Sequence, residues 1–246
     1  MSNIQLEIAV FNIEAALEAI EAGADRIEFC ENPSEGGTTP SYGSLVRMIQ
    51  RTAKPVFPII RPRGGDFLYS EEEFEVIKAD LLLVKELGYA GAVIGMLKED
   101  GAIDINRTAE LVSMAGNMEI TFHRAFDRCK DPYKGLEDII QTGCKRILTS
   151  GQVPNASDAI PLLKKLVEQA NERIIIMPGS GVRAANIQEI TSATGVTEIH
   201  SSARKAVSTK MHFNQPSMKE NMQVMGVDSD EIKAMLGAIK SSNKFQ

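Results

Sequence analysis

The sequence predicts an α/β fold, a (β/α)8 or TIM barrel, built as a single domain. Eight short apolar runs rich in Ile and Val alternate with amphipathic stretches, as the repeating unit of such a barrel requires. The length of 246 residues is close to that of one barrel. Polar and charged residues directly follow several apolar runs, where a barrel gathers its site. An open doubly wound sheet with about the same units is the competing fold.

The expected strands are short and bounded by Gly or Pro, which suits a parallel sheet buried on both faces. They are Gln5–Val10, Arg26–Cys30, Pro55–Ile60, Ala92–Gly95, Glu119–Phe122, Arg146–Leu148, Ile174–Met177 and Glu198–Ile199.

The stretches between the strands carry apolar residues at helical spacing and are expected as helices that pack on the sheet. They include Ile13–Glu21, Glu71–Leu87, Asn106–Met114, Tyr133–Gln141 and Asp158–Gln169. A glycine stands just before several strands, where a left-handed C-cap turns a helix into the next strand. These glycines are Gly23, Gly88, Gly116, Gly143 and Gly195.

The whole chain, 1–246, is expected to form this one barrel, with an irregular excursion at about 203–228 before a last helix over Asp230–Lys240. The excursion carries four methionines and Phe213. Apolar side chains in such a segment are expected either to pack on a partner subunit or to cover the barrel.

Composition argues against several classes of partner. The formal charge of −6 and a pI near 5.3 disfavour nucleic acid and anionic membranes, which select basic faces. We expect no signal peptide, because no basic segment followed by an apolar core opens the chain, and no membrane span, because no apolar run approaches roughly 18 residues. Three widely spaced cysteines favour a reducing cytoplasm over a disulfide framework.

The stretch Arg61–Phe67 is the richest candidate for ligand binding. Arg61 and Arg63 flank a proline, and glycines follow them before Asp66. Arginine is the preferred residue for two-point capture of a carboxylate or phosphate. The alternative is that Arg61 pairs with an acidic residue at the barrel mouth, such as Glu28.

His123, Arg124 and Asp127 follow the expected fifth strand, and His200 follows the eighth. Histidine titrates near neutral pH and can transfer protons or bind a metal. In a closed barrel both histidines face the same mouth, so we expect at least one to be functional. A pair of structural histidines bonded to the backbone is the alternative.

Glu7 and Glu28 lie inside strands that are otherwise apolar. An unpaired buried charge is very costly, so each carboxylate needs a partner. Glu28 is therefore expected to pair with an arginine or to face a polar layer of the barrel, and it is a candidate catalytic carboxylate.

Three short loops are expected to converge after strands six, seven and eight. Gly179-Ser180-Gly181 follows the seventh strand and is expected to open a helix near Val182. Free backbone N–H groups at such a point bind phosphate, and the last two loops of the barrel are its usual phosphate site. Ser150-Gly151 and His200-Ser201-Ser202 complete the set. Tight-turn packing is the alternative for these glycines.

Cys30 ends the second strand, and a thiolate there could bind soft Cu(I). No second cysteine is near in sequence and no CxxC motif is present, so a buried inert thiol is the alternative.

At these residues the chain resembles the CutC family. The resemblance runs to about Ser202 and rests on long motifs that occur in order. The motifs are Gly23-Ala24-Asp25-Arg26 with Glu28 and Cys30, Glu35 to Ser41, Ile59 to Phe67, Thr121 to Asp127, Leu148 to Gln152 and Glu198 to Ser202.

The resemblance implies a (β/α)8 barrel, a cytoplasmic location, a role in copper handling and a homo-oligomer, a dimer or tetramer. It also implies that Cys30 matches a cysteine to which copper binding is attributed. Some members carry a further cysteine in the first strand, where this chain has Ala9-Val10.

Two functional hypotheses follow. The first is a CutC-type copper homeostasis protein with a Cu(I) contact at Cys30. The second is an enzyme that acts on a small anionic or phosphorylated metabolite and needs no organic cofactor. In the enzyme, Arg61, Arg63 and Arg124 bind the anion, and His123 acts as general acid and base, oriented by Asp66 or Asp127. A scaffold that uses the Met-rich segment 211–225 as an interface is a third possibility.

Overall fold

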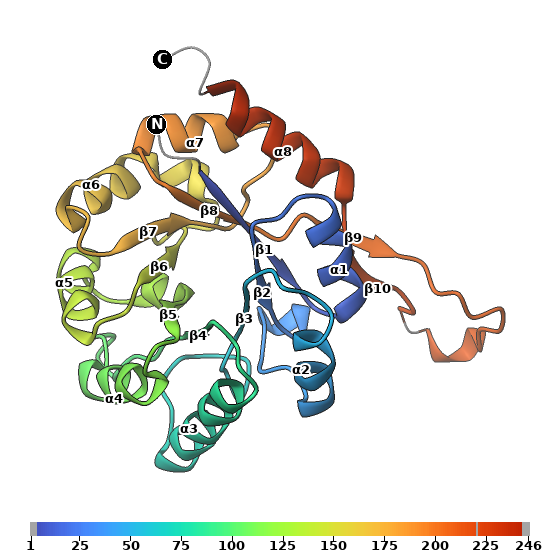
Figure 1. Cartoon of the computed structure of the whole chain (residues 1–246), viewed down its shortest axis with the longest axis horizontal. Coiled ribbons are helices and arrows are strands. Elements are labelled where there is room, and N and C mark those ends of the chain that lie inside the picture. The colour runs from blue at the N-terminus through green and yellow to red at the C-terminus, as the bar shows by residue number, and fades with distance from the viewer. Residues whose placement is uncertain (1–3, 220, 243–246) are drawn as a thin grey trace.

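Eight parallel strands form a ring that helices surround on the outside (Figure 1). The computed structural model describes residues 4–219 and 221–242. The strands of the ring are β1 Gln5–Val10, β2 Arg26–Phe29, β3 Val56–Pro58, β4 Gly91–Ile94, β5 Glu119–Phe122, β6 Arg146–Thr149, β7 Ile175–Pro178 and β8 Glu198–Ser201.

The strand order is that of a closed barrel. One half has the order β3-β2-β1-β8 and the other β4-β5-β6-β7, with parallel pairing throughout both halves. A parallel bridge between Ile59 and Val93 joins β3 to β4, and β7 lies beside β8 (Figure 1). The predicted (β/α)8 fold is confirmed, and the open sheet is not observed.

The helices follow the strands in turn. They are α1 Ile13–Glu21, α2 Tyr42–Ile49, α3 Glu71–Glu86, α4 Ile105–Ala115, α5 Pro132–Thr142, α6 Ile160–Ala170, α7 Ile187–Thr194 and α8 Ser229–Ser242. Short 3-10 helices are η1 Pro33–Glu35, η2 Arg124–Arg128, η3 Ala156–Ala159 and η4 Pro216–Met218. The sequence patterns predicted neither α2 nor the bounds of α7. The five glycines predicted to end helices all have positive φ, between 65° and 110°.

Side chains alternate between two environments along each strand. In β1, Leu6, Ile8 and Val10 belong to the large apolar core between the ring and the helices. Glu7 lies between them in sequence and is also buried, but it faces the inside of the barrel, where it meets charged partners. The barrel interior of this chain is therefore partly polar.

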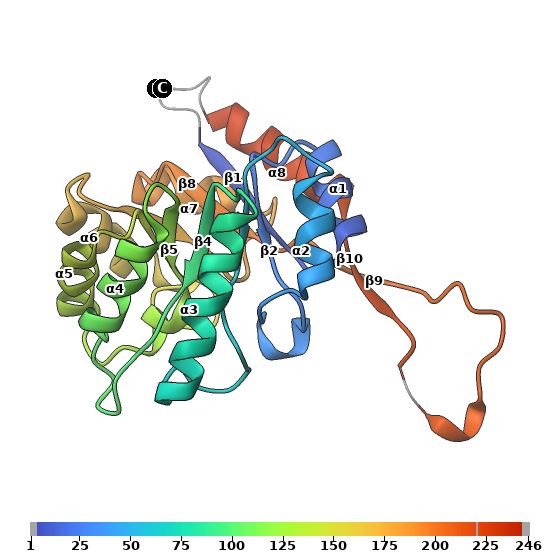
Figure 2. The same cartoon turned by 60° about the horizontal axis from the view of Figure 1, so that its bottom comes forward.

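The expected irregular excursion is an ordered antiparallel pair at its base. The strands β9 Arg204–Val207 and β10 Val224–Val227 leave the ring as an arm whose far end contains η4 (Figure 2). Asn12 holds the base by donating from Nδ2 to the carbonyl of Met225 at 2.7 Å. Met211 and Phe213 on the arm are exposed and do not cover the barrel.

Within residues 4–219 and 221–242, none of the helices has the length and apolar character that crossing a membrane requires. Cys30, Cys129 and Cys144 are buried free thiols.

Candidate functional site

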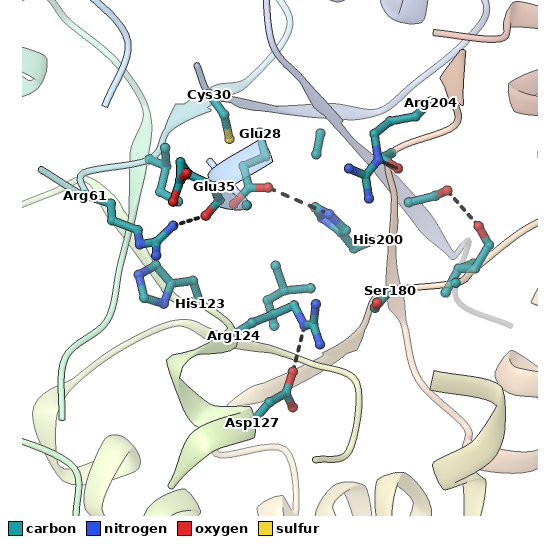
Figure 3. Close-up of a pocket in the computed structure, with 18 of the residues that line it drawn as sticks. Glu28, Cys30, Glu35, Arg61, His123, Arg124, Asp127, Ser180, His200 and Arg204 are labelled. Carbon is teal, nitrogen blue, oxygen red and sulfur yellow. Dashed lines mark hydrogen bonds and ion pairs between the residues drawn. The ribbon is translucent and has the colours of Figure 1, made fainter. Parts of the chain in front are cut away.

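A cavity of about 510 Å³ opens at the end of the barrel where the strands have their C-termini (Figure 3). Its wall combines side chains that follow different strands, as the sequence predicted for a closed barrel. The predicted residues in the wall are Glu28, Cys30, Arg61, His123, Arg124, Asp127, Ser180, Gly181, His200 and Ser201.

Arg63 and Asp66 lie outside the cavity, although they were expected at the ligand. Arg63 Nε is 2.5 Å from Glu73 Oε1, and a second nitrogen of its guanidinium is 3.0 Å from Asp66 Oδ1. The guanidinium also lies over the Tyr69 ring, with Cζ 5.2 Å from the ring centroid. Arg63 therefore stabilises the start of α3, and the Asp66 carboxylate pairs with Arg63 and not with His123.

Asp127 secures the loop that follows β6 and does not contact His123. Its carboxylate accepts hydrogen bonds from the backbone N–H of Ser150 at 3.0 Å and of Gln152 at 3.2 Å. It also pairs with Arg124 Nε at 2.7 Å. Ser150 and Gly151 are buried behind this network, so they support the wall without lining it.

Two glycines give the histidines their space. A β-carbon at Gly95 would lie 2.4 Å from His123 Nδ1. A β-carbon at Gly179 would lie 2.5 Å from Leu148 Cδ1 and 3.1 Å from His200 Cδ2. Because real β-carbons do not approach other atoms so closely, Gly179 is needed for the packing of Leu148 and His200.

The helix expected to open near Val182 begins only at Ile187. Ser180 and Gly181 both have left-handed φ values, 77° and 69°, so the chain turns here before the helix can start. Within the described residues, the backbone N–H groups of Gly181 and Val182 have no acceptor. An anion at this point would therefore meet a turn and not a helix N-terminus.

Below the cavity, charged side chains fill the barrel interior. Arg26 forms ion pairs with Glu7 and Glu198, and Arg146 Nε lies 3.0 Å from Glu198. Both guanidinium groups lie over the Phe57 ring. We call Arg26, Arg146, Glu7 and Glu198 the interior network. The sequence patterns missed its arginines and Glu198 because each stands at the start of a strand.

His200 joins the interior network to the cavity. Strand register places Glu7 beside both Arg26 and His200. His200 Nδ1 lies 2.8 Å from Glu7 Oε1, and Nε2 lies 3.7 Å from Glu28 Oε2 (Figure 3). The sequence left open an arginine partner or a polar layer of the barrel for Glu28, and the structure gives it His200 as its charged neighbour.

The pKa values of this group follow from its neighbours. Burial alone would raise the pKa of Glu7, but Arg26 and His200 lower it to about 2. Burial raises the pKa of Glu28 to about 7. Burial disfavours the charged His200, yet the hydrogen bond to Glu7 and the charge of Glu28 outweigh it and raise the pKa of His200. The protonation of Glu28 therefore depends on the charge of His200, and the protonation of His200 on the charge of Glu28.

His123 has the opposite character. Burial and the nearby charge of Arg61 lower the pKa of His123 to about 3, so the ring is neutral at physiological pH. Its Nδ1 accepts from the backbone N–H of Ala125 at 3.1 Å. A ring that is neutral at physiological pH is less suited to general acid and base chemistry than Glu28, whose pKa is raised to about 7.

Arg61 is buried, and backbone carbonyls hold its guanidinium. Nη1 donates to the carbonyls of Glu35 and Gly37, at 2.5 and 2.8 Å, and Nη2 donates to Gly65 at 3.0 Å. The pairing of Arg61 with Glu28 that the sequence left open is not observed.

The described wall of the cavity contains five arginines, of which only Arg124 pairs with a carboxylate among the described residues. Arg128, Arg183 and Arg204 were missed by the sequence patterns, although each follows a segment already marked as part of the mouth. In a protein of net charge −6, unpaired cations around one cavity favour a bound anion.

Cys30 does not provide a copper site of ordinary form. Burial, with the charges of Glu28 and Glu7, raises the pKa of its thiol well above the usual value, which disfavours the thiolate that binds metal. No set of three or more His, Cys, Asp or Glu residues in the described parts of the chain is grouped to hold a metal ion. The donors around Cys30 therefore do not fit a resident copper ion.

The fold and the cavity define a (β/α)8 barrel protein with a polar, arginine-rich pocket at the C-terminal mouth. The chain belongs to the CutC family, whose family model matches residues 4–205. A CutC family protein of Photorhabdus laumondii is 49% identical over 211 residues, which cover 86% of this chain and 84% of the relative. The human relative, named copper homeostasis protein cutC homolog, is 47% identical over 87% of this chain and 78% of its own length.

Solved structures agree with the fold. A crystal structure of a CutC protein from Streptococcus agalactiae has a TM-score of 0.76 and 34% identity, and covers 81% of this chain and 98% of its own. Phosphoribosylanthranilate isomerase from Thermotoga maritima has a TM-score of 0.59 at 14% identity, and covers 97% of this chain and 99% of its own. The second likeness concerns the barrel alone.

Proposed function

We propose that this CutC family protein is an enzyme that binds a small anionic, phosphorylated metabolite in the cavity and transfers protons through Glu28 and His200. The observation that carries the proposal is the set of unpaired arginines around the cavity, together with a carboxyl whose pKa is near 7 at its floor. A general acid or base works best when its pKa lies near the operating pH.

The residues divide into two groups in this proposal. Arg124, Arg183 and Arg204 bind the anion with the free backbone N–H groups of Gly181 and Val182, at the loops where barrels commonly bind phosphate. Glu28 and His200 exchange the proton, and Glu7 holds His200 in place from below. Glu7 is a positioning residue, because it acts through His200.

The first test is anion binding by calorimetry with inorganic phosphate, followed by thermal stabilisation with a panel of phosphorylated metabolites. A ligand that binds only the folded protein raises its melting temperature. Arg204→Gln is expected to weaken phosphate binding about tenfold, equivalent to about 1.4 kcal/mol.

The matched control is Arg63→Gln, which also removes a guanidinium from the same face but one that pairs with Glu73 outside the cavity. This variant is expected to bind phosphate like the wild type. Equal weakening in both variants, or no phosphate binding by the wild type, would contradict the proposed anion site.

The sequence predicted a Cu(I) contact at Cys30, and the name of the human relative refers to copper homeostasis. This contact has not been tested. Because the donors around Cys30 do not fit a resident ion, we expect the wild type and Cys30→Ser to bind Cu(I) alike in competition with a chromophoric chelator. Tight binding that Cys30→Ser abolishes would instead establish Cys30 as a copper ligand.

We also propose a cytoplasmic location and a homo-oligomer. Three cysteines that are free thiols support a reducing compartment. The exposed apolar side chains of Met211, Phe213 and Met218 on the arm support contact with a second copy of the chain.

A further inference from the structure

Four of the arginines in the cavity wall form two sets that follow different strands. Arg124 and Arg128 belong to η2, just after β5. Arg183 follows β7 and Arg204 follows β8. Neighbouring strands lie about 4.8 Å apart, so the chain positions after β5 and β8 are about 14 Å apart along the barrel rim. The two sets therefore start from well separated points of the rim.

Hydrogen bonds keep one guanidinium of each set at its own part of the rim. Arg124 Nε lies 2.7 Å from Asp127 Oδ2, and its Nη2 donates to Ser150 Oγ, after β6, at 2.9 Å. Arg204 Nε donates to Ser202 Oγ, after β8, at 3.2 Å. Figure 3 shows Arg124 turned toward Asp127 and apart from Arg204. The cavity thus offers two separate places for negative charge.

The two sets differ in the positive charge that they leave unpaired. Arg183 is half-buried and Arg204 is exposed, and neither forms an ion pair within the part of the chain that the structure describes. In the other set, Asp127 offsets the charge of Arg124. Arg128 is exposed and forms no ion pair with a described residue. The set after β7 and β8 therefore has two unpaired charges, and the set after β5 has one.

These charges match the two ends of a phosphorylated acid. A phosphate ester carries about −1.5 to −2 charges at pH 7, and a carboxylate carries about −1. Phosphate suits the set after β7 and β8, where the N–H groups of Gly181 and Val182 have no acceptor among the described residues. A carboxylate suits the set after β5, because one free guanidinium can hold both of its oxygens.

The fifth arginine of the wall, Arg61, lies on another side of the cavity, after β3. Backbone carbonyls bind its guanidinium, including that of Glu35 on η1. The Glu35 carboxylate packs against the backbone after β3, since a β-carbon at Gly64 would lie 1.8 Å from its Oε2. These two charged residues therefore do not neutralise either set.

We propose that the ligand of the cavity is a phosphorylated carboxylic acid. Arg183 and Arg204 bind its phosphate. Arg124 and Arg128 bind its carboxylate. The carbon chain between the two groups spans the part of the rim that follows β6. The inference rests on the proposed function and names the substrate class of the same cavity.

Calorimetry with four ligands tests the second anionic group. Glycerol 3-phosphate has a phosphate and no carboxylate, whereas phosphoglycolate, 3-phosphoglycerate and 4-phosphoerythronate add a carboxylate at increasing distance from the phosphate. At least one of the three acids is expected to bind the wild type at least about tenfold more tightly than glycerol 3-phosphate, because the second contact becomes intramolecular. The acid with the largest gain is then used with the variants.

Arg128→Gln is expected to lose most of this gain in affinity. It should bind glycerol 3-phosphate like the wild type, which also shows that the variant is folded. Arg128→Lys should keep part of the gain, since lysine keeps the charge but not the two-point contact. Arg183→Gln should instead weaken glycerol 3-phosphate and the acid by the same factor, about tenfold.

Arg63→Gln is the matched control, because this guanidinium pairs with Glu73 outside the cavity. It is expected to keep the whole gain. A control that loses as much as Arg128→Gln would mean that the gain is long-range attraction, and the inference would be overturned.

Two further results separate the inference from the proposed function. If glycerol 3-phosphate binds and none of the three acids binds more tightly, the inference falls while the proposed function stands. The same holds if Arg128→Gln weakens glycerol 3-phosphate and the acid equally. If none of the four ligands and no inorganic phosphate binds, the proposed function and this inference fall together.

Discussion

The inside of the barrel and its mouth both contain buried charged groups, but these groups are paired inside the barrel and incompletely paired at the mouth. In the interior network, Arg26 and Arg146 each contact carboxylates, and Glu198 serves both arginines. At the mouth, Arg61 Nε and His123 Nε2 lack partners, and Glu28 sits 3.7 Å from His200 in place of a close ion pair.

This difference separates charges that pair with one another inside the barrel from incompletely paired charges at its mouth. A buried ion whose partner is removed costs about 3–5 kcal/mol, so paired charges are coupled to folding. Groups at the mouth are incompletely paired, and this lowers the free energy of unfolding of the ligand-free protein. Substitutions in the two regions should therefore have opposite effects on stability.

The largest effect is expected for Glu7→Gln. The change leaves Arg26 with one carboxylate fewer and replaces the charged partner of His200 Nδ1 with a neutral amide. The free energy of unfolding at pH 7 should fall by about 3–5 kcal/mol. Urea titration measures it, and a loss below about 1 kcal/mol would show that the interior network does not behave as a set of coupled charges.

Glu28→Gln is expected to stabilise the protein at pH 8. The pKa of Glu28 is raised to about 7 by burial, so the wild type gains stability below the unfolded pKa of 4.5 and loses it as the pH rises through 7. A neutral amide avoids that loss of stability, which amounts to about 3 kcal/mol for a pKa that rises from 4.5 to about 7.

The measurement compares the melting temperatures of wild type and Glu28→Gln at pH 4.5 and at pH 8. The two proteins should differ little at pH 4.5, where the carboxyl is protonated in the folded state and about half protonated in the unfolded state. If Glu28→Gln raised the melting temperature more at pH 4.5 than at pH 8, the expected pH dependence would be wrong.

Gly95→Ala tests the space left for His123. The new methyl would lie 2.4 Å from Nδ1, so either the ring or the strand must shift, at about 1–3 kcal/mol. Gly43→Ala in α2 is the matched control, because its added methyl meets no atom within 4 Å. The control should be neutral or more stable by about 0.5–1 kcal/mol. Equal melting temperatures for the two variants would mean that His123 is not held by packing.

The smallest effect on stability is expected from shortening the arm between Val207 and Val224 to a tight turn. Because the arm projects away from the barrel (Figure 2), the free energy of unfolding of the barrel should change by less than about 1 kcal/mol. Light scattering should show that the wild type forms an oligomer and that the shortened chain is smaller. A wild type that is monomeric would refute the proposed role of the arm.

The fold was predictable because strand periodicity and helix-ending glycines act locally. The bounds of β1, β5 and α1 matched the predicted ranges to the residue. The hairpin at the base of the arm was missed because its exposed residues carry no burial pattern. The start of α7 was misplaced because the left-handed turn at Ser180 and Gly181 is a property of the folded loop.

The candidate site was predictable in position but not in pairing. Sequence order places His123, His200 and Arg61 after strands, and all three line the cavity. Which partner each would meet depends on strand register and on side-chain reach across the barrel. For that reason Arg63, expected at the ligand, pairs with Glu73, and Arg204 reaches the cavity unexpectedly.

Arg204 is both the first residue of the arm and a part of the cavity wall. Its Nε donates to Ser202 Oγ at 3.2 Å, and its backbone pairs with Val227 on the returning strand. The same residue therefore begins the arm and forms part of the cavity wall, so a change in the pairing of β9 with β10 alters the backbone that carries this guanidinium.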